Sequence, residues 1–200
     1  MAIITLTGNV DKRVIAYPLL KAMSIVGPTG VISDDTSLKR LYRDKGWKGR
    51  VDCIDIALTL DFEQDYEALF DDFGNVHTNY LFITDNFIPP RSNFVLMCRG
   101  ITESSFLQEV QDEVEEKKGE VLILTSNDKH KKMTNNIFAY NGSHLQFFSQ
   151  MEEQKVLSVP KDNLLRQFIA KTFASPLGMR PEELFKVLDR EEVQKRYEKF

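Results

Sequence analysis

The sequence has few cysteines, no long hydrophobic run and no excess of basic charge. Cys53 and Cys98 are its two cysteines and both lie within apolar runs, so we expect reduced core thiols in a cytoplasmic protein. No uninterrupted apolar run approaches the about 18 residues that a membrane span needs, and no basic region precedes the first apolar run, so we expect no signal peptide. The net charge of -4 argues against a surface that coats nucleic acid, but it leaves a local basic patch open.

Apolar runs that resemble strands alternate with helical patterns along the chain. Near-continuous hydrophobicity is typical of strands that are covered on both faces, as in a parallel sheet. The clearest helix is expected over residues 102–119, where Thr102 can cap the first turn and Phe106, Val110 and Val114 share one face. This alternation predicts a doubly wound α/β domain with a mainly parallel sheet. The predicted strands are residues 2–7, 30–33, 53–60, 80–85, 93–98 and 120–126.

The same runs predict which side chains form the core, and a composition change predicts the domain boundary. The stretch "ASPLGMRP" (residues 174–181) separates the apolar runs from a charged C-terminal segment. We therefore expect an α/β domain over residues 1–178 and a C-terminal helical extension over residues 179–200. The residues expected to be buried in the sheet are Ile4, Leu6, Val31, Ile54, Ile56, Phe82, Ile83, Val95, Leu96, Leu122 and Ile123.

The turn after the first strand, "TGNVDKR" (residues 7–13), has the position of a phosphate-binding loop but few of its residues. Such a loop needs small residues, a lysine for the β- and γ-phosphates and a hydroxyl for Mg²⁺. Counting the full spacing from Gly8 places Arg13, Val14 and Ile15 where Gly-Lys-Ser/Thr should stand, so the regular motif fails. A helix is expected to start near Val14 or Ile15, with Pro18 in its first turn.

Two interpretations of this turn stay open. The cations Lys12 and Arg13 next to a helix N-terminus would attract an anion. Equally, both can be solvated turn residues.

Several polar residues at predicted strand ends are candidates for binding, and each also has a structural explanation. Asp34 and Asp85 can hold a metal ion, and Asn127 can contact a base, but all three residue types are also common in turns and caps. Asp35 and Asp128 share this ambiguity. The histidines His77, His130 and His144 have no spacing typical of a zinc site. The basic residues Lys39, Arg40, Arg43 and Lys129–Lys132 can contact DNA phosphates or form solvated faces.

Taken in order, the motifs resemble the partition and division-site ATPases of the ParA/MinD type, a deviant-Walker P-loop group. The resemblance covers residues 2–177 and rests on the order of the motifs. It implies a P-loop NTPase-like three-layer domain. The motifs are the first loop and the helix "VIAYPLLKAMSIVG", the strand "GVISDD", the strand "NYLFITDNFIPP" with Asp85, Pro89 and Pro90, the strand and helix "NFVLMCRGITESSFLQEVQDEVEE", the strand "EVLILTSNDKHKK" with Asn127, and "KVLSVPKDNLLRQFIAKTFASPL" as a final strand, proline turn and helix.

The resemblance implies a nucleotide site and also shows where this chain departs from the family. The cofactor it implies is ATP with Mg²⁺ where the site functions, and otherwise none. The family loop reads Lys-Gly-Gly-x-Gly-Lys-Ser/Thr, whereas this chain has "GNVDKRVI". The vestigial phosphate and nucleotide site would consist of Gly8, Asn9, Val10, Asp11, Lys12, Arg13 and Asn127, with Asp34 and Asp85 as metal ligands.

We therefore expect a degenerate ParA/MinD-like protein with little or no ATP hydrolysis. It would act in DNA segregation or in positioning an assembly by binding a protein partner, with a homodimer and DNA contact also open. Two alternatives remain. One is a non-catalytic α/β interaction module, and the other is a nucleotide-dependent enzyme whose loop uses Lys12 in an irregular way.

Overall fold

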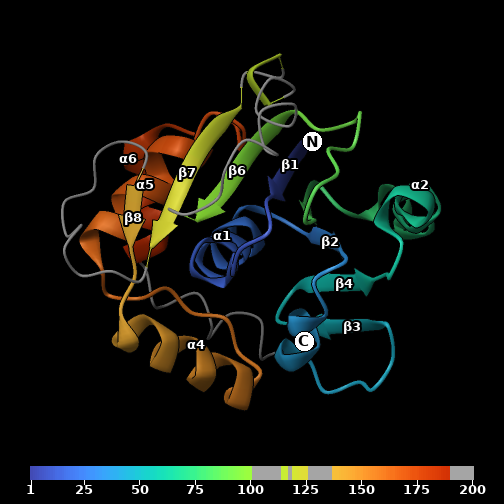
Figure 1. Ribbon diagram of the computed structural model, residues 1–200, viewed down its shortest axis with the longest axis horizontal. Helices are drawn as coiled ribbons and strands as arrows, with labels where there is room; N and C mark the ends of the chain where they lie inside the picture. Colours follow the sequence, from blue (N-terminus) through green and yellow to red (C-terminus); the bar gives the residue numbers. More distant parts are fainter. Residues whose placement is uncertain (101–113, 117–118, 126–136, 190–200) are drawn as a thin grey trace.

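A single twisted sheet organises the protein (Figure 1). The computed structural model describes residues 1–100, 114–116, 119–125 and 137–189. Among these residues the strands are β1 (Ala2–Thr7), β2 (Thr29–Ser33), β3 (Lys48–Val51), β4 (Ile54–Leu58), β5 (Asn79–Ile83), β6 (Phe94–Gly100), β7 (Glu120–Thr125) and β8 (Ile137–Ala139). The described helices are α1 (Arg13–Val26), α2 (Phe62–Phe73), α4 (Gly142–Gln154), α5 (Asn163–Phe173) and α6 (Pro181–Asp189), with the short 3₁₀ helices η1 (Thr36–Leu41) and η2 (Gly74–Val76).

The strand order confirms the predicted α/β class. The sheet runs β3-β4-β2-β5-β1-β6-β7-β8, and every neighbouring pair is parallel except β3 with β4. The chain begins at β1 in the middle and adds β2, β3 and β4 on one side, with β3 at the edge. It then places β5 between β2 and β1 and adds β6, β7 and β8 on the other side. Leu6 of β1 lies beside Ile83 of β5 and Leu96 of β6. This places the end of β1 at the centre of the sheet's carboxyl edge.

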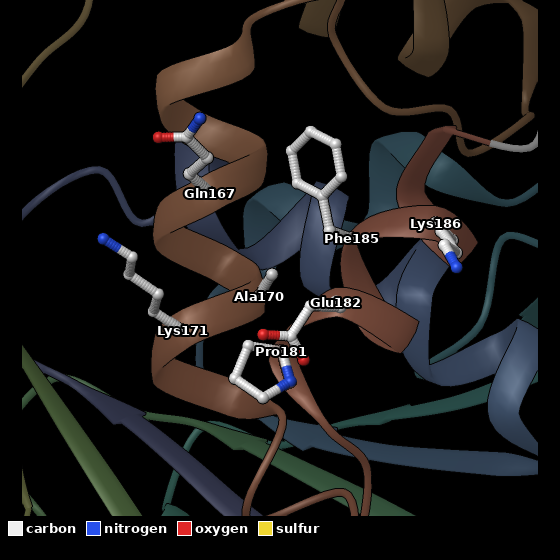
Figure 2. A pocket seen from close by; sticks show the side chains of 7 residues that line it. All are labelled: Gln167, Ala170, Lys171, Pro181, Glu182, Phe185 and Lys186. Atoms are coloured by element: carbon white, nitrogen blue, oxygen red, sulfur yellow. The ribbon is translucent and has the colours of Figure 1, made fainter.

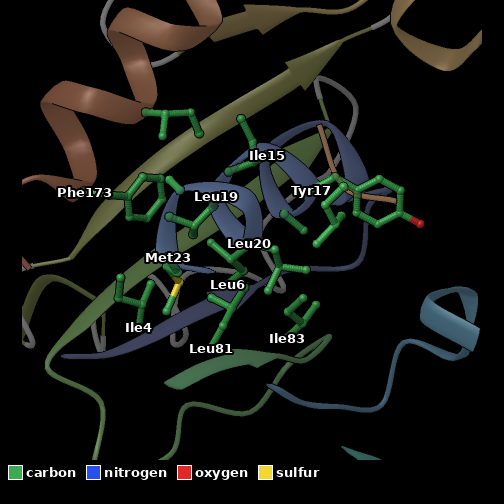
Figure 3. Packing of buried hydrophobic residues seen from close by; sticks show 14 of the residues in the cluster. Ile4, Leu6, Ile15, Tyr17, Leu19, Leu20, Met23, Leu81, Ile83 and Phe173 are labelled. Atoms are coloured by element: carbon green, nitrogen blue, oxygen red, sulfur yellow. The ribbon is translucent and has the colours of Figure 1, made fainter. Parts of the chain in front are cut away.

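Helices cover both faces, which gives three layers. On one face, α1 packs against the sheet together with α4, α5 and α6 (Figure 1). Figure 3 shows the centre of this core, where Leu19, Leu20 and Met23 of α1 lie close to Leu6 and Leu81 of the sheet. On the other face, an aromatic cluster joins the sheet to α2. It consists of Phe62, Tyr66, Leu69, Phe70, Phe73, Tyr80, Phe82 and Phe87 with Ile3 and Ile32.

The predicted core residues are buried with one exception. Ile4, Leu6, Val31, Ile54, Ile56, Phe82, Ile83, Val95, Leu96 and Leu122 are at most 1% exposed. The prediction for Ile123 was wrong, because this residue is only half-buried. Successive side chains of a strand point to opposite faces. Ile123 therefore lies on the opposite face of β7 from Leu122 and Leu124, which belong to the main core.

Several predicted boundaries change in the structure. The run at residues 53–60 forms a strand only over Ile54–Leu58, and half-buried Cys53 lies in the turn before it. That turn belongs to a hairpin with β3 that was not predicted, and Asp52 takes a positive φ of 51° there. The short strand β8 was not predicted either. The final strand that the resemblance implied near residue 156 is irregular chain, although α5 follows it as expected.

Two predicted helices, the one after the first loop and the one over residues 102–119, can be compared with the structure. α1 begins at Arg13, so Pro18 is its sixth residue and not part of the first turn. The missing N–H of Pro18 leaves the carbonyl of Val14 without its usual helical partner. The helix predicted over residues 102–119 lies mostly outside the described residues, although Val114 is buried in a described helical turn as the periodicity predicted.

α6 packs onto the α/β core. Leu184 and Leu188 join the main core, and Asp189 pairs with Arg166 of α5 at 2.7 Å between Oδ1 and Nη1. The domain boundary at residue 178 stays a prediction. Across the described ranges, no helix combines the length and the apolar character needed to cross a bilayer.

Candidate phosphate-loop site

The loop between β1 and α1 is fixed to both neighbouring strands. The Gly8 N–H donates to the carbonyl of Asp85 after β5 at 2.8 Å. Gly8 has φ +114°, and a Cβ at this position would lie 1.8 Å from the Cys98 carbonyl oxygen of β6. Only glycine fits such a backbone approach. The adjacent Cys98 is fully buried, and burial raises the pKa of its thiol to about 12, so this cysteine is an unreactive core residue.

Lys12 turns its side chain back into the loop. The residue is 2% exposed, and its Nζ donates to the Gly8 carbonyl at 2.5 Å and to the Val10 carbonyl at 3.4 Å. The same Nζ lies 2.9 Å from Oδ1 of Asp85. An ammonium group carries three donors. All three therefore have acceptors within the protein itself.

Asp11 occupies the N-terminus of α1 with its own carboxylate. Its Oδ1 accepts from the Arg13 backbone N–H at 3.1 Å, and its carboxylate also accepts from Nε and Nη2 of Arg13, the latter at 2.6 Å. Burial acts to raise the pKa of Asp11, but the hydrogen bonds from Arg13 outweigh it and leave that pKa below its ordinary value. The bonds to Asp11, together with Glu152, raise the pKa of Arg13. A helix N-terminus that would attract an anion already holds one.

The two predicted metal ligands lie next to each other at the same edge. Asp34 Oδ2 accepts from the Asp85 backbone N–H at 3.4 Å. The other oxygen, Oδ1, is buried and has no hydrogen-bond partner among the described residues. Burial raises the pKa of Asp34, and the nearby Asp85 carboxylate raises it further. The structure therefore brings Asp34, Asp85 and Lys12 together at this edge of the sheet.

This arrangement does not fit Mg²⁺ with ATP. Mg²⁺ in nucleotide sites is held by carboxylates, a loop hydroxyl and the phosphates. Here Lys12 pairs with Asp85, and Arg13 stands where the loop would supply a hydroxyl if it is counted from Lys12. Over the described part of the chain, no three histidine, cysteine or acidic side chains converge into a metal-binding group.

Counting from Lys12 describes the loop better than counting from Gly8. Lys12 directly precedes α1, the position that a phosphate-loop lysine takes at the start of its helix. With that anchor, Asp11 replaces the second glycine and Arg13 replaces the Ser or Thr, while Val14 and Ile15 are core residues. The loop was aligned on Gly8 in the sequence because the start of the helix was predicted at Val14 or Ile15. The helix begins one or two residues earlier, at Arg13, and this start identifies Lys12 as the matching lysine.

Glu152 is part of the site and was not predicted. This α4 residue accepts from Arg13 Nη1 at 3.0 Å and from the Tyr17 hydroxyl at 2.8 Å, both on Oε1. Arg40 lies 3.7 Å from its Oε2. Glu152 therefore connects the loop, α1 and η1 to α4. No local pattern marks such a residue, because its partner Arg13 is 139 positions away.

The remaining candidate residues have structural roles or lie outside the site. Asn9 is exposed, while half-buried Val10 packs against the core. Asp35 caps η1 by accepting from the Ser37 N–H at 2.9 Å. Asn127, Asp128, Lys129–Lys132 and His130 lie outside the described residues.

The two described histidines are fixed by neighbouring polar side chains. His77 Nε2 lies 2.9 Å from Asp55. His144 forms a capping box with Asn141 and also contacts Asp162. These contacts are typical of structural histidines. Each histidine has one carboxylate beside it, and the described residues place no third histidine, cysteine or acidic side chain at either position.

A groove between α5 and α6 lies apart from the loop. It has a volume of about 300 Å³ and is mainly apolar, and none of the loop residues lines it. Figure 2 shows Phe185 between the two helices, with Lys171 and Lys186 on the outside. The other lining residues are Gln167, Ala170, Pro181 and Glu182.

Comparisons with known proteins show only a low similarity between this chain and two solved structures. No family model matches the sequence, and no curated protein matches it. Among solved structures, the chain is similar to the MinD cell division protein of Aquifex aeolicus and to a chain of the MinC:MinD cell division protein complex of the same organism. Each has a TM-score of 0.46 and 9% identity over 95% of this chain, and covers 96% and 95% of the solved chain respectively.

Proposed function

We propose that this protein is a degenerate ParA/MinD-like protein that acts by binding a partner, in DNA segregation or in positioning a cellular assembly, and hydrolyses ATP little or not at all. The observation that carries the proposal is a phosphate loop whose charges are satisfied internally. Lys12 donates to Gly8, Val10 and Asp85, and Asp11 covers the N-terminus of α1. The order of motifs in the sequence supports the ParA/MinD-like role.

A phosphate that entered this loop would have to displace the protein's own groups. It would compete with the Asp11 carboxylate for the Arg13 N–H and for the guanidinium. It would also have to draw Lys12 out of a buried position, which leaves the Gly8 and Val10 carbonyls without that donor. Each unpaired buried polar group costs about 1–3 kcal/mol. Since phosphoryl transfer depends almost wholly on positioning and electrostatics, a loop that holds phosphate poorly also catalyses poorly.

One observation favours a second candidate, a nucleotide-dependent protein with an irregular loop. Lys12 has the right place in the chain, directly before α1, and lies beside an acid at the end of β5. In this alternative, nucleotide binding moves Lys12 from Asp85 to the phosphates. The two candidates therefore differ in how much free energy it costs to move Lys12 away from Asp85. The cost is too high for nucleotide binding in the first candidate, and nucleotide binding offsets it in the second.

Equilibrium titration with ATP, ADP and GTP, with and without Mg²⁺, separates the candidates. We expect dissociation constants weaker than about 1 mM, which corresponds to less than about 4 kcal/mol of binding free energy. We also expect phosphate release from ATP no faster than that of the Lys12→Ala variant. Micromolar, Mg²⁺-dependent binding with turnover that Lys12→Ala abolishes would establish the second candidate instead.

The partner-binding part of the proposal includes a homodimer and contact with DNA. Sedimentation of the full chain over a range of concentrations tests the dimer, and titration with duplex DNA at two salt concentrations tests the DNA contact. A monomer that binds neither itself nor DNA would leave a heterologous protein as the partner.

A further inference from the structure

Strand β3 lies at one edge of the sheet (Figure 1), and the segment that runs from η1 into β3 is rich in basic residues. Between residues 39 and 50 the chain carries six cations and only one acid, Asp44, for a local net charge of +5 in a chain whose net charge is -4. We call these residues the η1–β3 surface. Its cations are Lys39, Arg40, Arg43, Lys45, Lys48 and Arg50.

Some of these cations are neutralised within the protein and others are not. Arg40, Lys48 and Arg50 form ion pairs with Glu152, Asp72 and Asp55. Arg43 and Lys45 are exposed, and no carboxylate of the described chain pairs with either of them. Arg43 and Lys45 lie within the five residues that precede β3, and Lys39 of η1 has no carboxylate partner among the described residues either.

The tryptophan of this chain lies within the same surface. Trp47 is the single tryptophan of the sequence, is 42% exposed, and has the Lys39 ammonium 3.5 Å from its ring centroid. Cation–π pairs of this kind are attractive even at exposed sites. They also hold the ring in one orientation. An exposed tryptophan next to unpaired cations is typical of residues that dominate protein interfaces.

The backbone around Trp47 is held in place by contacts with Tyr42 and with β4. Tyr42 is buried, and its hydroxyl donates to the Gly46 carbonyl at 3.2 Å. Its ring lies so close to Gly49 that a Cβ there would be 2.1 Å away. On the other side, the Trp47 carbonyl accepts from the Leu58 N–H of β4 at 2.7 Å. A surface held in this way loses little conformational entropy when a partner binds.

Charge decides which kind of partner this surface fits. Nucleic-acid binders with strong salt dependence neutralise about 6–10 phosphates, whereas this surface offers only Arg43, Lys45 and Lys39 without a carboxylate partner. The rest of the chain is acidic and would repel a long polyanion. A short acidic segment with an apolar side chain matches both the few free cations and the exposed indole ring.

We propose that the η1–β3 surface is a docking site for an acidic segment of a partner protein, anchored on Trp47 and on Arg43 and Lys45. The outer edge of β3, which pairs only with β4 among the described strands, adds free backbone donors and acceptors beside the anchor. This inference rests on the proposed function, because it names the surface through which partner binding occurs.

The test is selection of binding peptides on the intact protein. A display library of random 16-residue peptides is panned against the full chain alone, and the enriched peptides are then titrated against the Arg43→Glu/Lys45→Glu variant. We expect enriched peptides to be acidic with at least one large apolar residue. Because Trp47 is the single tryptophan, their binding should shift or quench its fluorescence in a saturable, salt-sensitive way.

Matched variants make the result specific. Trp47→Ala and Arg43→Glu/Lys45→Glu should each weaken peptide binding at least tenfold. Lys171→Glu/Lys186→Glu, which changes the charge equally on exposed residues of α5 and α6, should weaken it less than twofold. Far-ultraviolet circular dichroism and thermal unfolding establish that the variants are folded.

Three outcomes would overturn the inference. The first is that no peptide is enriched, or that the enriched peptides have no acidic bias. The second is that they bind the Arg43→Glu/Lys45→Glu variant as well as the parent. The third is that single-stranded oligothymidylate quenches Trp47 at lower concentration than any selected peptide, which would assign the surface to nucleic acid. None of these outcomes depends on nucleotide binding. A failure of the docking inference can therefore be distinguished from a failure of the proposed function, which nucleotide titration tests.

Discussion

Removing the carboxylate of Asp11 should make the loop between β1 and α1 accessible to phosphate, and the structure sets the size of the effect. In the parent protein this carboxylate accepts from the Arg13 N–H at 3.1 Å and pairs with the Arg13 guanidinium at 2.6 Å. Hydrogen bonds to a charged group contribute about 1.5–3 kcal/mol each. The Asp11 side chain is 37% exposed, so solvent screening reduces the competing free energy to about 1–2 kcal/mol.

Asp11→Gly should therefore bind inorganic phosphate and ATP between about 5-fold and 30-fold more tightly than the parent. Isothermal titration with each anion measures this ratio. Asp11→Asn is the matched control. It keeps an oxygen acceptor for the Arg13 N–H but removes the charge, so its affinity should fall between those of the other two proteins.

The source of the gain can be traced with a second variant. Adding Arg13→Ala to Asp11→Gly should remove most of the gain, because the Arg13 guanidinium is the cation that loses its partner when Asp11 is removed. Equal phosphate affinity for the parent and Asp11→Gly, with both proteins folded, would refute the view that Asp11 closes the site. So would a micromolar affinity in the parent.

Three further changes test other parts of the structure. Gly8→Ala should lower the free energy of unfolding by at least about 3 kcal/mol in denaturant titration, because Gly8 has a positive φ and the new Cβ would collide with the Cys98 carbonyl. The control Gly142→Ala should change stability little, because its position has open space around it. Glu152→Gln should destabilise the fold by about 1–3 kcal/mol, because Arg13 and Tyr17 lose their charged acceptor, whereas the exposed neighbour in Glu153→Gln should be neutral. Asp34→Asn should raise the melting temperature near about pH 7 but not near about pH 3, because the raised pKa of Asp34 means that its ionisation destabilises the folded state as the pH rises; a benefit that is the same at both pH values would contradict the assigned cause.

The sequence by itself determined the architecture and most of the core. Near-continuous apolar runs such as residues 2–7 predict strands that are covered on both faces, and β1 is buried along its whole length. The sequence also determined that the first loop lacks the small residues and the hydroxyl of a regular phosphate loop. These features are local. A pattern of neighbouring side chains is enough to specify them.

Tertiary structure decided the directions and the partners of the charged groups. Lys12 meets Asp85 across 73 positions, and Arg13 meets Glu152 across 139, so no local pattern reveals that the loop is closed. The edge strands β3 and β8 have four and three residues and form only because longer strands lie beside them. Ile123 is only half-buried because it lies on the opposite face of β7 from the main core. Pairing between distant segments sets all of these features, because the free energy of each contact depends on atoms that the fold alone brings together.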